Sequence, residues 1–181
     1  QWIHSGKGII HSERPGKEVL NDEGKNEIIQ FWVNTPAKHK MEAPYYLPLS
    51  AEETPVIEKG GATISVVTGT FDGVKGPAKT YSPQTLLRGT TKAGASFTVD
   101  IPQHYNTLVY LLDGEMEIGG KSVGNKTMFW FNNDGEQIDI KTSKASRFIV
   151  LSGEPIGEPI STYGPFVMNT EQEIQQAIAD Y

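Results

Sequence analysis

The residues best suited to chemistry lie near the start of the sequence, in Gly8-Ile9-Ile10-His11-Ser12-Glu13. In an extended strand, His11 and Glu13 are two positions apart and project from the same face. An imidazole nitrogen and a carboxylate oxygen are donors that suit Fe(II) and other first-row divalent metals. Catalytic metal sites use three or four ligands and keep a position open. Taken alone, the pair indicates half of a metal site, and a polar pair on a half-exposed strand would have the same spacing.

The other histidines have no spacing that completes this set. His4 precedes His11 by a stretch with two glycines, so the spacing does not decide whether they share a face, and we expect a polar role for His4 at a sheet edge. His39 lies between two lysines, and we expect it to be solvated or hydrogen-bonded. Three aromatic residues could line a pocket for a flat substrate or belong to the core: Trp2, Phe31 and Trp32.

Composition excludes several function classes. The 181 residues carry a net charge of −6 and no stripe of Lys or Arg, so we expect no direct binding of nucleic acid. The absence of cysteine excludes disulfides, thiolate zinc sites and cysteine nucleophiles. No apolar run approaches the roughly 20 residues that span a bilayer. We expect a soluble cytoplasmic protein without membrane contact, or a nuclear one if the source is eukaryotic.

Most of the chain has the pattern of short strands separated by turns. Apolar or β-branched runs occur at 64–68, 107–112, 115–118, 127–131 and 147–151. The first four end at Gly, Asn or Asp, and the last ends at Ser152-Gly153. Gly119-Gly120 suits a tight hairpin, because glycine reaches positive φ at low cost. Closely spaced strands of this kind predict an all-β sandwich or barrel.

The clearest helix is at the C-terminus. Thr170-Glu171-Gln172-Glu173 has the form of a capping box, in which each of the two end residues accepts a hydrogen bond from the backbone of the other. Four apolar residues then recur at helical spacing and predict one stripe that docks onto the sheet: Ile174, Ala177, Ile178 and Tyr181.

Three long segments resemble the pirin family, two-barrel members of the cupin superfamily. Residues 1–15 are similar to the segment that closes the N-terminal pirin barrel, residues 29–40 to the strand and loop that follow it, and residues 163–178 to the pirin tail. The resemblance implies a cupin-type double-stranded β-helix, or jelly-roll, with remnant strands of a first barrel and a short C-terminal α-helix. It places the remnant at 1–48, and the C-terminal barrel with its helix at 49–181.

The resemblance also implies a mononuclear iron site of three His and one Glu in the N-terminal barrel. His11 and Glu13 match the last His and the Glu. The other two ligands belong to an upstream His-x-His motif, and we expect that a segment before Gln1 is missing. In the second barrel the corresponding ligand positions fall on Asp100, Pro102 and Asn106, with His104 beside them, so we expect that barrel to be metal-free.

Two functions follow from the resemblance. The intact protein would be an Fe(II)-dependent quercetin 2,3-dioxygenase acting on a flavonol-like molecule, with Glu13 as metal ligand or catalytic base. This chain would then be inactive or nearly so. The alternative is a non-enzymatic transcriptional co-regulator or protein-binding module. A chain with an opened first barrel should expose apolar surface, and it should keep its missing piece, pair with a neighbour or pack residues 1–40 onto the second barrel.

Overall fold

The protein is described here by a computed structural model, which covers residues 1–14 and 27–181. These residues form two compact units. Unit 1 comprises residues 1–2 and 47–157, and unit 2 comprises residues 3–46 and 158–181. The C-terminal segment thus groups with the N-terminal one, whereas a domain boundary near residue 48 stays a prediction. Pro15, the last residue of the first pirin-like segment, lies outside the described residues.

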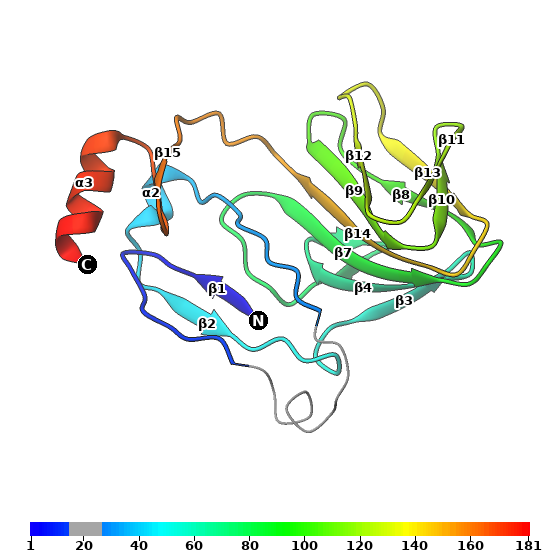
Figure 1. The fold of residues 1–181 in the computed structure, drawn as a ribbon, viewed down its shortest axis with the longest axis horizontal. Coiled ribbons are helices and arrows are strands. Elements are labelled where there is room, and N and C mark those ends of the chain that lie inside the picture. The colour runs from blue at the N-terminus through cyan, green and yellow to red at the C-terminus, as the bar shows by residue number, and fades with distance from the viewer. Residues whose placement is uncertain (15–26) are drawn as a thin grey trace. The chain divides into compact units, whose positions relative to one another are not determined.

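Unit 1 is built from two antiparallel sheets. The larger sheet has the order β12-β9-β14-β7-β4-β3, and the smaller has the order β11-β10-β13-β8 (Figure 1). The strands of the larger sheet are β3 (Val56–Lys59), β4 (Ala62–Thr68), β7 (Gln84–Thr91), β9 (Asn106–Asp113), β12 (Thr127–Trp130) and β14 (Ser146–Gly153). Those of the smaller are β8 (Ser96–Asp100), β10 (Glu115–Ile118), β11 (Lys121–Gly124) and β13 (Gln137–Thr142). A short hairpin joins β5 (Thr70–Phe71) to β6 (Val74–Lys75).

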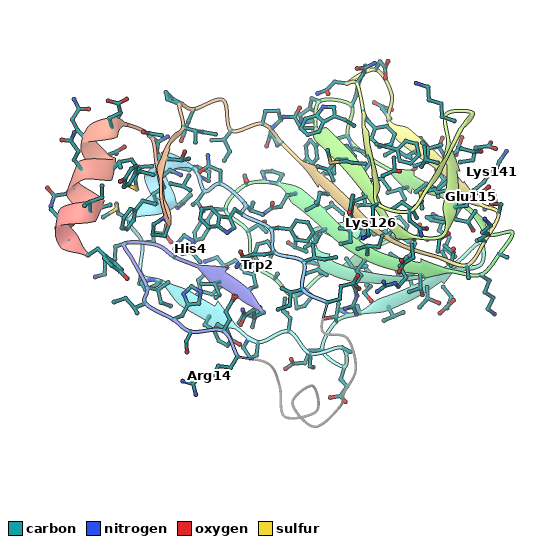
Figure 2. All side chains as sticks on the ribbon, viewed as in Figure 1. Trp2, His4, Arg14, Glu115, Lys126 and Lys141 are labelled. Carbon is teal, nitrogen blue, oxygen red and sulfur yellow. The ribbon has the colours of Figure 1, made fainter. Side chains whose placement is uncertain are left out.

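The core of unit 1 fills the space between these sheets (Figure 2). Burial alternates along β4 and β9, because successive side chains of a strand point to opposite faces. Val109 of β9 lies opposite Val150 of β14 in the register, and both side chains are fully buried. The rings of Phe97 and Phe148 stack with their centroids 5.5 Å apart. The expected all-β jelly-roll is therefore confirmed.

The hairpin predicted at Gly119-Gly120 joins β10 to β11. Ile118 pairs with Lys121, so the two glycines form the whole loop. Their φ angles are +57° and +73°. Two positive φ angles in a two-residue loop match the twist of the flanking strands, and glycine adopts them without steric cost.

Unit 2 contains small elements. β1 (Trp2–His4) pairs with β2 (Tyr45–Leu47), and both lie in unit 2 except for their end residues Trp2 and Leu47, which belong to unit 1. β15 (Ser161–Tyr163) pairs with β16 (Phe166–Met168). Two helices complete it: α2 (Ala37–Lys40) is a single turn, and α3 (Glu171–Asp180) packs against β15 and β16.

The capping box at the start of α3 is confirmed. Glu173 N donates to the Thr170 hydroxyl at 3.2 Å, and Thr170 N donates to the Glu173 carboxylate at 2.8 Å. Of the predicted apolar stripe, Ile174 is buried, but Ile178 and Tyr181 are exposed. The stripe therefore docks mainly through Ile174.

Within the described residues, no helix has the length and apolarity needed to cross a membrane.

Candidate metal centre

The segment that carries His11 and Glu13 leaves β1 through a tight turn at Ser5–Gly8. Gly8 N donates to Ser5 O at 2.9 Å, and Lys7 N donates to Glu42 O at 2.9 Å. Gly6 has a φ of +51°, and a Cβ at this position would lie 2.1 Å from Glu42 O. Only glycine fits there, so this close approach fixes where the following segment starts.

Residues 8–14 form neither a helix nor a strand. The strand that would place His11 and Glu13 on one face is therefore absent from this segment. The two side chains nevertheless lie near each other, with His11 Nε2 4.0 Å from Glu13 Oε1. Both are well exposed, at 43% and 42% of their side-chain surface.

This distance is larger than that between adjacent ligands of one metal ion. Metal–nitrogen and metal–oxygen bonds are about 2.0–2.2 Å, so two ligands at a right angle lie about 3 Å apart. The two donor atoms would have to approach by about 1 Å to occupy adjacent positions. Since residues 8–14 form no sheet hydrogen bonds, a small adjustment of this segment breaks no strand pairing.

The other histidines lie in different surroundings. His4 is buried on β1 (Figure 2), and its ring centroid is 5.5 Å from that of Tyr45. It therefore packs inside unit 2 and is not a polar edge residue as expected. His39 Nδ1 contacts Glu42 Oε1 at 2.5 Å, which confirms its hydrogen-bonding role. Within residues 1–14 and 27–181, no three His, Cys, Asp or Glu side chains converge as a metal site.

Two of the three aromatic residues considered for a pocket are open to solvent. Trp32 is 63% exposed and Phe31 is 37% exposed, while Trp2 is partly buried. They do not belong to the hydrophobic core cluster, which lies in unit 1. A pocket role for these residues stays a prediction.

The second barrel differs at the positions that correspond to the iron ligands. Asp100, Pro102 and Asn106 are exposed. Pro102 and His104 line a shallow hollow at one end of unit 1, together with Gln103, Asn133 and Glu136. His104 Nε2 lies 3.7 Å from Glu154 Oε1.

The interior of that barrel is apolar. A Cβ at Gly89 would lie 2.1 Å from Cζ of Phe148, so the phenyl ring occupies the space beside β7. At the rim, burial raises the pKa of Tyr105, and the charge of Glu154 adds to this effect. That the second barrel holds no metal stays a prediction from its side-chain types.

The two-sheet jelly-roll of unit 1 defines a cupin-type barrel. The family model of the pirin C-terminal cupin domain matches residues 86–181, just over half of the chain. Pirin-like protein 2 of Arabidopsis thaliana is 37% identical over 190 residues, which cover all of this chain and 57% of that protein. Pirin of Homo sapiens is 35% identical over 186 residues, which cover all of this chain and 62% of that protein. The chain belongs to the pirin family.

A solved structure supports the same assignment. The crystal structure of quercetin 2,3-dioxygenase from Acinetobacter baumannii superposes with a TM-score of 0.78 at 34% identity. The match covers 82% of this chain and 53% of that one. The chain thus spans about three fifths of the length of the curated relatives named above, at 57% and 62%.

Proposed function

We propose that this protein contributes His11 and Glu13 to an Fe(II) site of a pirin-type oxidoreductase that acts on a flavonol-like small molecule. The observation that carries the proposal is the 4.0 Å approach of His11 Nε2 to Glu13 Oε1. The segment containing this pair resembles the metal-binding segment of pirins. The 34% identity to a quercetin 2,3-dioxygenase supports the substrate class.

The two side chains fit such an ion in donor type. A neutral imidazole and a carboxylate both suit Fe(II), and each is accessible from solvent. When bound, the metal would supply Lewis acidity and one-electron chemistry with O₂. Two ligands do not complete a catalytic set, so this chain by itself should hold the ion weakly and turn over little substrate.

Glu13 could also act as a catalytic base. A carboxylate within hydrogen-bond reach of a flavonol hydroxyl can take its proton, and the exposed position of Glu13 leaves room for a ligand to approach. Direct ligation and proton transfer differ in what a Glu13→Gln substitution removes. If the Glu13→Gln variant no longer retains iron, Glu13 is a metal ligand. If a variant with a completed site retains iron but no longer turns over substrate, Glu13 is the catalytic base.

The first test is metal retention. The chain is loaded with Fe(II) under anaerobic conditions, desalted and analysed for iron, beside its His11→Ala and Glu13→Ala variants. We expect weak retention, well below one ion per chain, that falls further in both variants. His104→Ala is the matched control, because His104 is also an exposed histidine with a carboxylate neighbour, 3.7 Å away. Equal retention by the His11→Ala variant and the parent chain would refute the site.

The second test concerns turnover. Fusion of an upstream pirin segment containing the His-x-His motif should raise iron retention to about one ion per chain. Quercetin consumption should then appear, and His11→Ala should abolish it. A fused protein that holds iron and consumes no quercetin contradicts the oxidoreductase and favours a binding role.

A protein-binding role is the second candidate, and exposed apolar surface in unit 2 favours it. Ile10, Ile28 and Met41 are 83%, 74% and 62% exposed. Large apolar patches mark protein-interaction sites, so the binding role requires these three side chains to form one patch. Replacement of Ile10 and Ile28 by Ser should leave metal retention unchanged and reduce self-association or partner binding, measured by analytical ultracentrifugation and pull-down. Unchanged association would remove support for this second role.

A further inference from the structure

The C-terminal segment of unit 2, residues 158–181, is attached with little apolar burial. We call this segment the strap. Ile174 is its one buried residue. Large apolar side chains are exposed by 45% to 81% at Ile160, Tyr163, Ile178 and Tyr181. Within the described part of the chain, β15 and β16 pair only with each other. Because hydrophobic stabilisation scales with the apolar area removed from water, it contributes little to holding the strap in place.

The carboxylate of Glu158 joins the strap to α2 by a hydrogen bond. Glu158 Oε2 accepts from Ala37 N, the first residue of α2, at 2.7 Å. The same oxygen accepts from Asn169 Nδ2 at 3.1 Å, and this nitrogen also donates to Pro159 O at 2.9 Å. Glu158 therefore ties α2 to both ends of the β15–β16 hairpin.

The buried ammonium group of Lys40, at the end of α2, adds electrostatic attraction between α2 and the strap. The Lys40 side chain donates to Asn34 Oδ1 at 2.5 Å and to Thr35 O at 2.6 Å, within its own turn. Burial lowers the pKa of Lys40, and the negative charges of Glu158 and Glu173 oppose that shift. The negative charges of Glu158 and Glu173 thus act on Lys40, a residue that is only 7% exposed.

The strap begins directly after a glycine that suits a hinge. Gly157 has a φ of +69°, and a Cβ at this position would meet no atom within 4 Å. Residues 154–160 form neither helix nor strand. A side chain at Gly157 would thus meet open space, and rotation of the backbone there would break no strand pairing.

We propose that residues 158–181 form a releasable strap, latched on α2 by Glu158 and hinged at Gly157, which opens as one piece while unit 1 stays folded. Opening frees the amide of Ala37 and uncovers the ammonium of Lys40. This gives unit 2 a second state in which Lys40, buried in the first, becomes accessible beside the already exposed Lys38. The inference does not depend on the proposed metal site.

Hydrogen exchange of the full chain, followed by mass spectrometry, tests the strap. Glu158→Ala removes the acceptor of both hydrogen bonds, and we expect exchange in residues 161–181 to rise on the order of tenfold. Glu158→Gln keeps one acceptor oxygen and should give a smaller rise. Peptides from β9 and β14 should be unchanged in both. Glu171→Gln, which removes an exposed charge from the same strap, is the matched control and should leave exchange as in the parent chain.

Two results would overturn the proposal. Unchanged exchange in residues 161–181 of Glu158→Ala would show that Glu158 is no latch, and an equal rise in β9 and β14 would show that the strap does not open separately. If Glu158→Ala does not fold, Lys40→Met replaces it, with Lys38→Met on the exposed side of α2 as its control. Lys40→Met must then raise exchange in the strap, and a rise limited to residues 34–40 refutes the latch.

Discussion

The two units of the protein differ in what they bury. In unit 1 the fully buried side chains are apolar except for Thr68, and the largest include Leu87, Leu111, Met116 and Phe148. In unit 2 the buried residues of the described part are His4, Pro36, Lys40 and Ile174. One unit is thus ordered by an apolar core and the other by a few polar contacts around a lysine and a histidine.

This difference predicts how a substitution destabilises each unit. An apolar core is shared by many residues, so the loss of one large side chain lowers the free energy of unfolding of the whole unit. Polar contacts such as Glu158 to Ala37 are few and directional, so the loss of one partner opens the structure locally. Substitutions should therefore have global effects in unit 1 and regional effects in unit 2.

The largest effect is expected for Phe148→Ala in unit 1. The Phe148 ring is fully buried, stacks on Phe97 and fills the space above Gly89. Its removal should lower the free energy of unfolding by about 3–5 kcal/mol through lost burial and the cavity left behind. Equilibrium unfolding in urea measures this change.

Trp130→Ala serves as the control for Phe148→Ala. Trp130 lies on β12 of the same sheet, but 68% of its surface is exposed. Its truncation should change the free energy of unfolding by less than about 1 kcal/mol. If the two variants are destabilised equally, burial in the apolar core does not govern the stability of unit 1, and the comparison between the units is wrong.

A smaller and regional effect is expected for Gly6→Ala in unit 2. The new Cβ would lie 2.1 Å from Glu42 O and would impose a φ of +51° on alanine. The local free energy of opening should fall by more than about 1 kcal/mol, because both the clash and the backbone strain act against the folded turn. Hydrogen exchange of the Lys7 amide, which donates to Glu42 O, reports on this turn.

The matched control for Gly6→Ala is an alanine at a glycine without these constraints. A Cβ at Gly135 would meet no atom within 4 Å, and the φ of this residue lies outside the left-handed region. Gly135→Ala should leave exchange of the Lys7 amide unchanged. Faster exchange at β9 and β14 in Gly6→Ala would show that the turn contributes to unit 1 as well, against the regional effect we expect.

The contrast also explains how much of the fold could be predicted. The strands β9, β10 and β12 follow from alternating or continuous apolar residues, and the start of α3 follows from its capping box. Strand β7 has no such pattern, although it is central in the larger sheet. Its only large apolar residues are Leu86 and Leu87, which are followed by Arg88 and Gly89. Gly89 is required there because the Phe148 ring lies against it.

The candidate site was predicted in part. The types of His11 and Glu13 and their resemblance to pirins identified the pair, but the strand assumed to align them is not formed. The contact of Ala37 with Glu158 joins residues 121 positions apart. Neither Lys38-His39-Lys40 nor the residues around Glu158 form a motif that indicates this contact. Long-range polar pairs depend on the tertiary fold, so a single sequence carries little signal for them.

The smallest expected effect is a dependence of the α3 cap on pH. It tests whether a change in unit 2 stays within that unit. The pKa of Glu173 is lowered from its ordinary value of 4.5, first by the Thr170 hydroxyl and further by the amides of Asn169 and Thr170 and the charge of Lys40. A carboxyl whose pKa is lower in the folded state stabilises that state above its ordinary pKa. This contribution is lost as the pH falls through the lowered value.

Two-dimensional NMR of the amides of Asn169 and Thr170 should therefore show opening of the cap below pH 4.5, while amides of β9 and β14 keep their positions. Glu173→Gln is the matched control, because glutamine also serves in a capping box but does not ionise. The variant should lose the acid-induced change at these two amides. A change of the same size in the variant would assign the acid response to another carboxyl, and simultaneous loss of the β9 signals would show that acid unfolds both units together.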